Sequence, residues 1–141
     1  MVFYFLYNLV ICDFQAATNI QVVTSSGWDC ISGIPTTDIC SSEWEGIKCV
    51  NGSIITISYK YYNNLYGTLP SSVGLLTDLT ILNFYETFMY GTLPTSIILL
   101  TKLQSLIFCY SYFTGKIPTG IVFLTNLQNI FLYSSYFTGV I

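Results

Sequence analysis

A short glycine-containing motif recurs at a constant spacing along the second half of the chain. It reads GTLP from Gly67 and from Gly91, GKIP from Gly115 and GVI from Gly139, so equivalent glycines lie 24 residues apart. A repeat of about this length with apolar residues at fixed offsets is typical of a solenoid, in which each unit buries its apolar side only against its neighbours. We therefore expect function to lie on a repeated surface, and we expect each glycine to make a tight bend.

The composition suits a single folded domain and excludes several functional classes. The 141 residues are 52% hydrophobic and 8% charged, with a formal net charge of −3 and no histidine or arginine. A chain without a basic patch is a poor partner for nucleic acid. A chain without histidine lacks the usual general base and metal ligand. We therefore expect no enzymatic activity, no cofactor, no metal site and no nucleic-acid partner.

The N-terminal segment is apolar and resembles a secretion signal. Residues 1–12 read MVFYFLYNLVIC, with only Asn8 interrupting the apolar run. This run is shorter than the roughly 20 residues that a transmembrane helix needs. Ala16 and Ala17 offer a cleavage site. The sequence thus predicts a signal peptide over residues 1–17, with a buried or uncleaved segment as the alternative.

The chain has five cysteines, Cys12, Cys30, Cys40, Cys49 and Cys109. Cys12 would leave with a cleaved leader. Cys40 and Cys49 bracket a compact segment that contains a tryptophan, which favours a disulfide between them in a secreted chain. Cys30 is unassigned, with Cys40 and Cys49 as its alternative partners. The spacing matches no zinc-binding pattern. Cys109 is expected to be exposed on a strand and, with no cation beside it, unreactive.

Apolar residues occupy the same offsets before each glycine. They are Leu79, Leu82 and Phe84 in one unit, Leu103, Leu106 and Phe108 in the next, and Leu127, Ile130 and Leu132 in the third. The spacing of Leu82 and Phe84 is the period-two pattern of a short strand with one buried face. We expect the strands of successive units to pair in parallel, with Phe84, Phe108, Phe113 and Phe137 in the core.

The first unit is out of step with the others by one residue. A strict register would place Ser58 and Lys60 where the next unit has Leu82 and Phe84. We instead expect Ile55, Ile57 and Tyr59 to face the core, with one extra residue in a widened turn before Asn63.

These offsets resemble the pattern LxxLxxLxLxxNxLxGxIPxx of plant-type leucine-rich repeats, found in receptor-like kinase ectodomains and polygalacturonase-inhibiting proteins. The match covers residues 55 to 141. The preceding segment resembles the family's N-terminal cap through Trp28, Cys40, Trp44, Gly46, Ile47 and Cys49. The resemblance implies a leucine-rich repeat α/β solenoid. It has short parallel strands on its concave face, irregular or 3-10 segments on its convex face, a cysteine-containing cap over residues 18–52 and about four repeats over residues 53–141.

The family's turn asparagine is present at Asn63 but is replaced by a hydroxyl residue in later units, at Thr87, Ser111 and Ser135. A hydroxyl has one donor where the amide has two, so we expect looser turns there. The last unit ends without an evident C-terminal cap. We therefore expect its apolar residues Ile130, Leu132, Phe137 and Ile141 to be exposed, with fraying or self-association at that end.

Residues beside the inward leucines would form columns on the concave face at 24-residue steps, and one such column is Tyr85, Cys109 and Tyr133. We predict a ligand-binding surface made of Thr80, Asn83, Tyr85, Glu86, Gln104, Ile107, Tyr110, Gln128, Phe131 and Tyr133. Exposed aromatic rings on one face suit a protein or peptide ligand, with carbohydrate as a further ligand class. The alternative is that the rings only stack across strands and stabilise the sheet.

The resemblance predicts an extracellular recognition module, secreted or on the outer face of the plasma membrane, that belongs to a longer receptor-like protein. The alternatives are a secreted inhibitor of a polysaccharide-degrading enzyme and a truncated fragment. A membrane would be reached only through a missing C-terminal part. Asn51 begins a glycosylation sequon. The acidic residues Asp38, Glu43 and Glu45 are expected to be solvated surface charges and not a carboxylate pair for hydrolysis.

Overall fold

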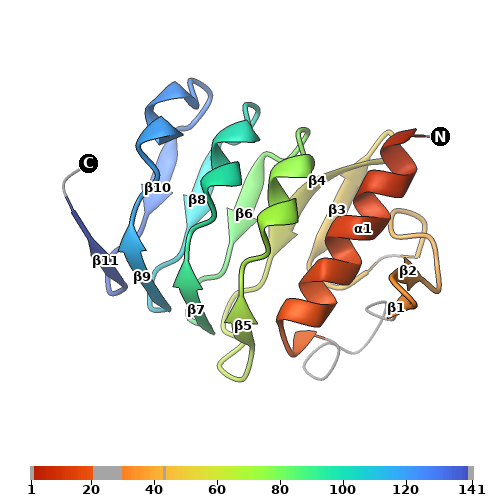
Figure 1. Cartoon of the computed structure of the whole chain (residues 1–141), viewed down its shortest axis with the longest axis horizontal. Coiled ribbons are helices and arrows are strands. Elements are labelled where there is room, and N and C mark those ends of the chain that lie inside the picture. Colours follow the sequence, from red (N-terminus) through yellow and green to blue (C-terminus); the bar gives the residue numbers. More distant parts are fainter. Residues whose placement is uncertain (1, 21–29, 43, 140–141) are drawn as a thin grey trace.

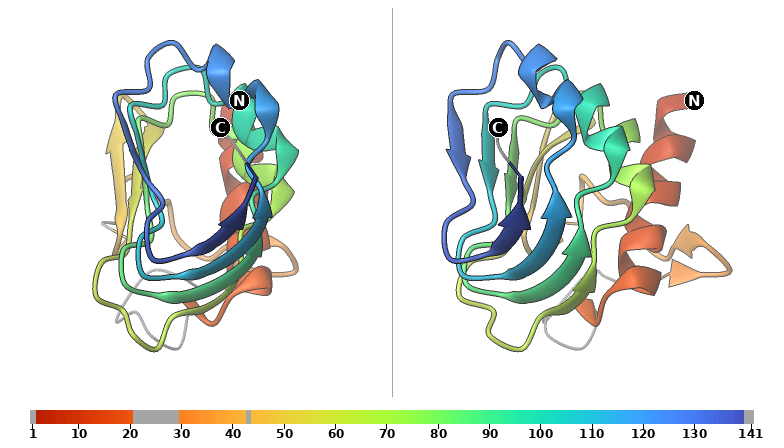
Figure 2. Two further views of the ribbon diagram at one scale, coloured as in Figure 1. Left: turned by 90° about the vertical axis from the view of Figure 1, so that its left-hand side faces the viewer. Right: turned by 60° about the vertical axis from the view of Figure 1, so that its left-hand side comes forward.

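The computed structural model describes residues 2–20, 30–42 and 44–139 of the chain. After an N-terminal helix and a small cap, the chain winds through successive turns that stack on one another (Figures 1 and 2). Each complete turn contains a strand of a first sheet, a strand of a second sheet and a 3-10 helix. The three sides enclose one apolar core.

The first sheet consists mainly of parallel strands. They are β4 (Ser53–Ser58), β6 (Ile81–Asn83), β8 (Ser105–Ile107) and β10 (Asn129–Phe131), with β3 (Ile47–Val50) antiparallel to β4 at one edge. Leu82 pairs with Leu106, and Leu106 with Ile130, so equivalent residues of neighbouring turns lie side by side. Leu82 and Leu106 are fully buried. The parallel pairing predicted from the repeat is confirmed.

The first turn has the shifted register that the sequence indicated. Ile57 pairs with Leu82, 25 residues later, and both Ile57 and Tyr59 are fully buried. The extra residue lies in the turn after the strand. The prediction for Ile55 is wrong, because this residue is only partly buried while Ile54 is fully buried. The antiparallel pairing with β3 is irregular at Lys48 and Cys49, where the ladder shifts by one residue and places Ile54 opposite Cys49.

A second parallel sheet runs beside the first. Its strands are β5 (Tyr66–Thr68), β7 (Phe88–Thr92), β9 (Tyr112–Lys116) and β11 (Tyr136–Thr138). Gly67, Gly91 and Gly115, where tight bends are expected from the repeat, lie within these strands and all have positive φ. Gly115 has φ of +78°, and a Cβ atom there would lie 2.8 Å from the Cγ2 atom of Thr92 in the preceding turn. At Gly115 both the positive φ and the close approach of the preceding turn therefore favour glycine.

The third side of each turn is a 3-10 helix, as the repeat family implies. The helices are η1 (Ser71–Leu75), η2 (Thr95–Leu99) and η3 (Thr119–Phe123), and each begins after a proline. Phe84, Phe108 and Phe113 are fully buried between these sides, with the Phe84 and Phe108 rings stacked at 5.7 Å. Phe137 is only partly buried.

The last described turn is the most open part of the core. Ile130 is 40% exposed, whereas Leu82 and Leu106 at the same position are fully buried. Leu132 and Phe137 are partly buried, and Ile141 lies outside the described residues. The exposure expected for Ile130 is therefore confirmed, while fraying and self-association stay predictions.

The N-terminal segment forms the helix α1 (Val2–Ala17), which packs against the first 3-10 helix and the cap. Tyr7, Val10, Ile11 and Phe14 recur at helical spacing and are buried, so they form one apolar face. The ring of Phe14 stacks on Phe84 at 5.7 Å. In the full chain this segment therefore closes the first end of the core, as the buried N-terminal segment of the alternative interpretation would. Cleavage after residue 17 stays a prediction.

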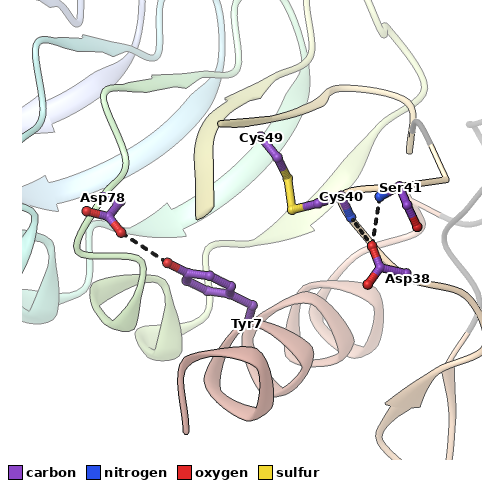
Figure 3. The surroundings of a disulfide bond; sticks show 6 residues. All are labelled: Tyr7, Asp38, Cys40, Ser41, Cys49 and Asp78. Carbon is purple, nitrogen blue, oxygen red and sulfur yellow. Dashed lines mark hydrogen bonds between the residues drawn. A yellow bond between two sulfur atoms is a disulfide. The ribbon is translucent and has the colours of Figure 1, made fainter. Parts of the chain in front are cut away.

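Polar contacts attach α1 and the following residues to the repeats. The Tyr7 hydroxyl donates a hydrogen bond to Asp78 (Figure 3). Asp78 also pairs with Lys102 at 2.6 Å. The hydrogen bond from Lys102 holds the pKa of Asp78 below its usual value. Asn19 exchanges backbone and side-chain hydrogen bonds with Tyr66 at the edge of the second sheet.

Two disulfides hold the cap. One joins Cys40 to Cys49, the pairing that the sequence favoured (Figure 3). The other joins Cys30, in the short hairpin of β1 (Cys30–Ile31) and β2 (Ile34–Pro35), to Cys12 of α1. Neither alternative partner of Cys30 is the observed one, because α1 lies in the fold and carries Cys12 to the hairpin, with Cα atoms 5.7 Å apart. Trp44 is buried and donates to the Thr37 hydroxyl, whereas Trp28 lies outside the described residues.

Candidate binding site on the concave face

The outward side of β4, β6, β8 and β10, which we call the concave face, contains a shallow depression of about 280 Å³. The lining residues come from the ends of these strands and the turns after them. They are Lys60, Tyr61, Asn83, Tyr85, Ile107, Cys109, Phe131 and Tyr133.

Each strand of this sheet ends in a turn with the same backbone conformation. One residue per turn has a positive φ in the left-handed region, and these residues are Tyr61, Glu86, Tyr110 and Ser134. They lie 25, 24 and 24 residues apart, which repeats the register of the strands. The residue before each of them lines the depression, and these residues form one column, Lys60, Tyr85, Cys109 and Tyr133.

Four tyrosine rings form a continuous series along these turns. The centroids of Tyr61 and Tyr85 are 5.3 Å apart, those of Tyr85 and Tyr110 5.6 Å, and those of Tyr110 and Tyr133 5.5 Å, all edge to face. Edge-to-face contacts stabilise aromatic pairs beyond the area that they bury. The stacking that the sequence analysis gave as an alternative is therefore present. It leaves Tyr110 49% and Tyr133 56% exposed, so these two rings can also contact a ligand.

Short polar side chains support the turns from below. The hydroxyls of Thr87 and Ser111 donate to the carbonyls of Phe84 and Phe108, three residues earlier, at 3.2 and 2.6 Å. The Ser135 hydroxyl also reaches the Phe108 carbonyl, at 2.5 Å. The hydroxyl residues thus bond to the carbonyl at the end of the strand, while Asn63 is exposed. The looser turns expected from this replacement remain a prediction.

Cys109 lies at the floor of the depression and is fully buried, so the prediction of an exposed thiol was wrong. Its larger column neighbours Tyr85 and Tyr133 line the same depression, and Tyr133 is hydrogen-bonded to the thiol. Burial raises the pKa of the Cys109 thiol, and the hydrogen bond to that thiol raises the pKa of Tyr133. Both groups are neutral near pH 7. The floor of the site therefore offers hydrogen bonds and apolar contact, but no activated nucleophile.

The structure gathers half of the predicted residues around the depression. Asn83, Tyr85, Ile107, Phe131 and Tyr133 line it, and Tyr110 joins them through its ring contacts. Asn83 is buried and its side-chain oxygen accepts the Tyr85 amide at 3.0 Å, so it has a structural role as well.

The remaining predicted residues do not line the depression. The Thr80 hydroxyl donates to the Ile55 carbonyl at 2.8 Å, which uses it within the sheet. Gln104 and Gln128 are exposed at the starts of their strands, and Glu86 is exposed in its turn.

Three lining residues were missing from the predicted set. Lys60 and Tyr61 belong to the first turn, and the one-residue shift aligns them with Tyr85 and Glu86. Applying that shift to the column positions would have found both. Cys109 was placed in the correct column, but its role was missed because its burial depends on the neighbouring rings.

Other candidate sites have structural roles or stay untested. Asn51 is exposed in the two-residue turn between β3 and β4, and its glycosylation stays a prediction. Asp38 and Glu45 are partly buried and hydrogen-bonded within the cap. The Asp38 carboxylate accepts the amides of Cys40 and Ser41, and the Glu45 carboxylate accepts the Tyr62 hydroxyl and raises the pKa of Tyr62 to about 12. Glu43 lies outside the described residues. None of the helices in the described ranges is both long and apolar enough to cross a bilayer.

Parallel strands at a 24-residue step, 3-10 helices after each proline and a disulfide-linked cap define the class of this fold. It is the fold of plant-type leucine-rich repeat ectodomains. No family model matches the sequence, and no curated protein matches it.

Solved structures with this fold are similar over most of the chain. PEPR1, in its structure with AtPEP1, is 24% identical with a TM-score of 0.77 over 94% of this chain and 18% of PEPR1. The leucine-rich repeat ectodomain of the receptor kinase SOBIR1 from Arabidopsis thaliana is 19% identical, with a TM-score of 0.63 over 89% of this chain and 68% of that chain. The plant peptide hormone receptor RGFR1, in complex with RGF2, is 26% identical, with a TM-score of 0.58 over 70% of this chain and 19% of that chain. The chain thus spans less than a fifth of the length of PEPR1 and of RGFR1.

Proposed function

We propose that this chain is an extracellular recognition module of a longer receptor-like protein, and that it binds a protein or peptide ligand on the concave face. The depression beside exposed tyrosines is the observation that carries this proposal. Its size suits one or two side chains of a larger ligand, because whole small-molecule sites usually exceed about 300 Å³. The tyrosine rings supply contact area around it with little conformational entropy to lose.

The chemistry of the site supports binding and not catalysis. The thiol and phenol groups are neutral near pH 7, and among the described residues no ion pair is formed by Lys60. A ligand carboxylate could therefore pair with Lys60 while an apolar ligand side chain contacts Ile107 and Phe131. An inhibitor of a polysaccharide-degrading enzyme is less favoured, since the residues lining the depression include no charge other than Lys60.

The likeness to receptor ectodomains supports an extracellular location and ligand recognition in general. RGFR1 is described as a peptide hormone receptor, which makes peptides the first ligand class to test. Two disulfides are also typical of proteins that fold in an oxidising compartment.

The test uses a random peptide library displayed on phage and selected against the immobilised full chain. We expect the library to yield peptides that bind the chain. Tyr133→Ala should weaken their affinity by about tenfold or more, which is the usual effect of losing a central aromatic anchor. Tyr136→Thr is the matched control, because Tyr136 is equally exposed but belongs to the second sheet. Circular dichroism must show that both variants fold.

Two results would contradict the proposal. The library could yield no peptide that binds, or the selected peptides could bind Tyr133→Ala as well as the parent chain. In the second case the tyrosine series would be purely structural.

A further inference from the structure

The outward face of the second sheet presents a row of exposed aromatic rings. Along β5, β7, β9 and β11 alternate residues point inward and outward, and the outward ones are the exposed ones. The outward rings are 48% to 61% exposed, and they belong to Tyr66, Phe88, Tyr90, Tyr112 and Tyr136. Figure 2 shows this sheet at the side of the coil, with no helix across its outer face.

Threonines occupy the other outward positions, together with Lys116. These threonines are Thr68, Thr92, Thr114 and Thr138. The Thr114 hydroxyl donates to the Gly91 carbonyl at 3.3 Å. Within the described part of the chain, the other three hydroxyls have no hydrogen-bond partner. We call these outward rings and threonines, with Lys116, the Tyr/Thr face.

The Tyr/Thr face repeats at the spacing of the strands. Tyr66 and Tyr90 are equivalent in the 24-residue repeat, as are Phe88, Tyr112 and Tyr136. In the ladder Tyr66 pairs with Phe88, and Tyr90 with Tyr112. Phe88 lies 5.6 Å from Tyr112, and Tyr112 lies 6.0 Å from Tyr136, between ring centroids. The surface therefore offers similar groups at a step set by the strand separation of about 4.8 Å. Such a surface matches a polymer of identical units better than an irregular protein surface.

The charge of this face also favours a neutral partner. Lys116 is its only ionic side chain, and it carries no carboxylate. About a quarter of the residues of an average protein are charged. Charges of a protein partner would lose water against this face without finding opposite charges, which is unfavourable. A neutral sugar polymer brings hydroxyls for the threonines and apolar CH groups for the electron-rich ring faces.

We propose that the Tyr/Thr face binds a neutral β-linked polysaccharide whose chain runs across the strands from β5 toward β11. Tyrosine and phenylalanine rings contact the CH surfaces of successive sugars, and the threonine hydroxyls bond to sugar hydroxyls. This site is separate from the concave face and does not depend on the ligand proposed there.

The test measures depletion of the full chain from solution by insoluble cellulose, β-1,3-glucan and chitin. We expect retention on at least one of these polymers, unchanged between about 0.1 M and about 1 M NaCl because no ion pair is involved. The double variant Tyr90→Thr/Tyr136→Thr should weaken retention by about tenfold or more. Threonine keeps the strand preference and is the residue that the chain itself has at Thr114, one turn after Tyr90.

Tyr133→Ala is the matched control, and it should bind the polysaccharide like the parent chain. In the peptide experiment Tyr133→Ala should weaken binding and Tyr136→Thr should not. Failure of one proposal is therefore distinguishable from failure of the other. The proposal is overturned by absence of retention on all three polymers, or by retention that the double variant leaves unchanged. It is equally overturned if the chain is retained only by acidic polygalacturonate and if that retention is lost at high salt concentration.

Two other occupants of this face would also overturn the proposal. Thermal hysteresis that the double variant removes, without polysaccharide binding, would identify ice as the recognised surface. A dimer in sedimentation that the double variant dissociates, again without polysaccharide binding, would identify a second copy of the chain.

Discussion

The turn after each strand of the first sheet holds one residue in the left-handed region. None of Tyr61, Glu86, Tyr110 and Ser134 is a glycine or an asparagine, the residues that take this conformation most easily. For other residues the left-handed conformation costs roughly 1–2 kcal/mol. Each of these turns therefore holds one residue at a cost in backbone energy.

Replacing Glu86 by asparagine should relieve part of this strain. Glu86 is exposed with φ of +55° and does not line the depression, so the change affects mainly the backbone. We expect Glu86→Asn to raise the free energy of unfolding in urea by about 0.5–1 kcal/mol. Glu86→Gln is the control, since it removes the same charge without favouring the left-handed region. Equal stability of the two variants would mean that the turn is not strained.

At the scale of elements, the sequence predicted the first sheet but not the second. Leu82 and Phe84 flank the polar Asn83, which gives a clear period of two. In β7 the consecutive residues Phe88, Met89 and Tyr90 are all apolar, although only Met89 points inward. Because the outward residues of this sheet are aromatic, the alternation that reveals a half-buried strand is hidden.

The helix α1 shows the same limit of sequence reasoning. A short apolar run is typical both of a secretion signal and of a helix buried in a core, and periodicity alone does not separate them. The structure of the full chain adds the contacts that the sequence could not show, including Phe14 on Phe84 and the Cys12–Cys30 disulfide.

The contribution of α1 to stability can be measured on the full 141-residue chain. Phe14 is fully buried, so Phe14→Ala should lower the free energy of unfolding by about 3–5 kcal/mol. Leu9→Ala, on the exposed side of the same helix, should lower it by less than about 1 kcal/mol. Urea unfolding followed by circular dichroism compares the two. Similar small losses would show that α1 is not part of the folded core.

At the scale of the whole molecule, the 24-residue step predicted which residues share a column but not how deep each one lies. Tyr85, Cys109 and Tyr133 were placed in one column from the repeat alone. Cys109 is nevertheless buried and Tyr133 exposed, because depth depends on the relative size of neighbours in the column. For the same reason equivalent leucine positions contribute different amounts to the free energy of unfolding, because each contribution depends on the turns stacked on either side.

Leu106 and Ile130 provide the sharpest measure of this dependence. They occupy the same position in neighbouring turns, but Leu106 is fully buried and Ile130 is 40% exposed. We expect Leu106→Ala to lower the free energy of unfolding by about 2–5 kcal/mol and Ile130→Ala by less than about 1 kcal/mol. Urea unfolding of both variants at two protein concentrations gives the comparison. If both variants lose the same free energy of unfolding, and the loss grows with protein concentration, copies of the chain cover Ile130 in solution. If the equal losses do not depend on concentration, the last turn packs as tightly as the others.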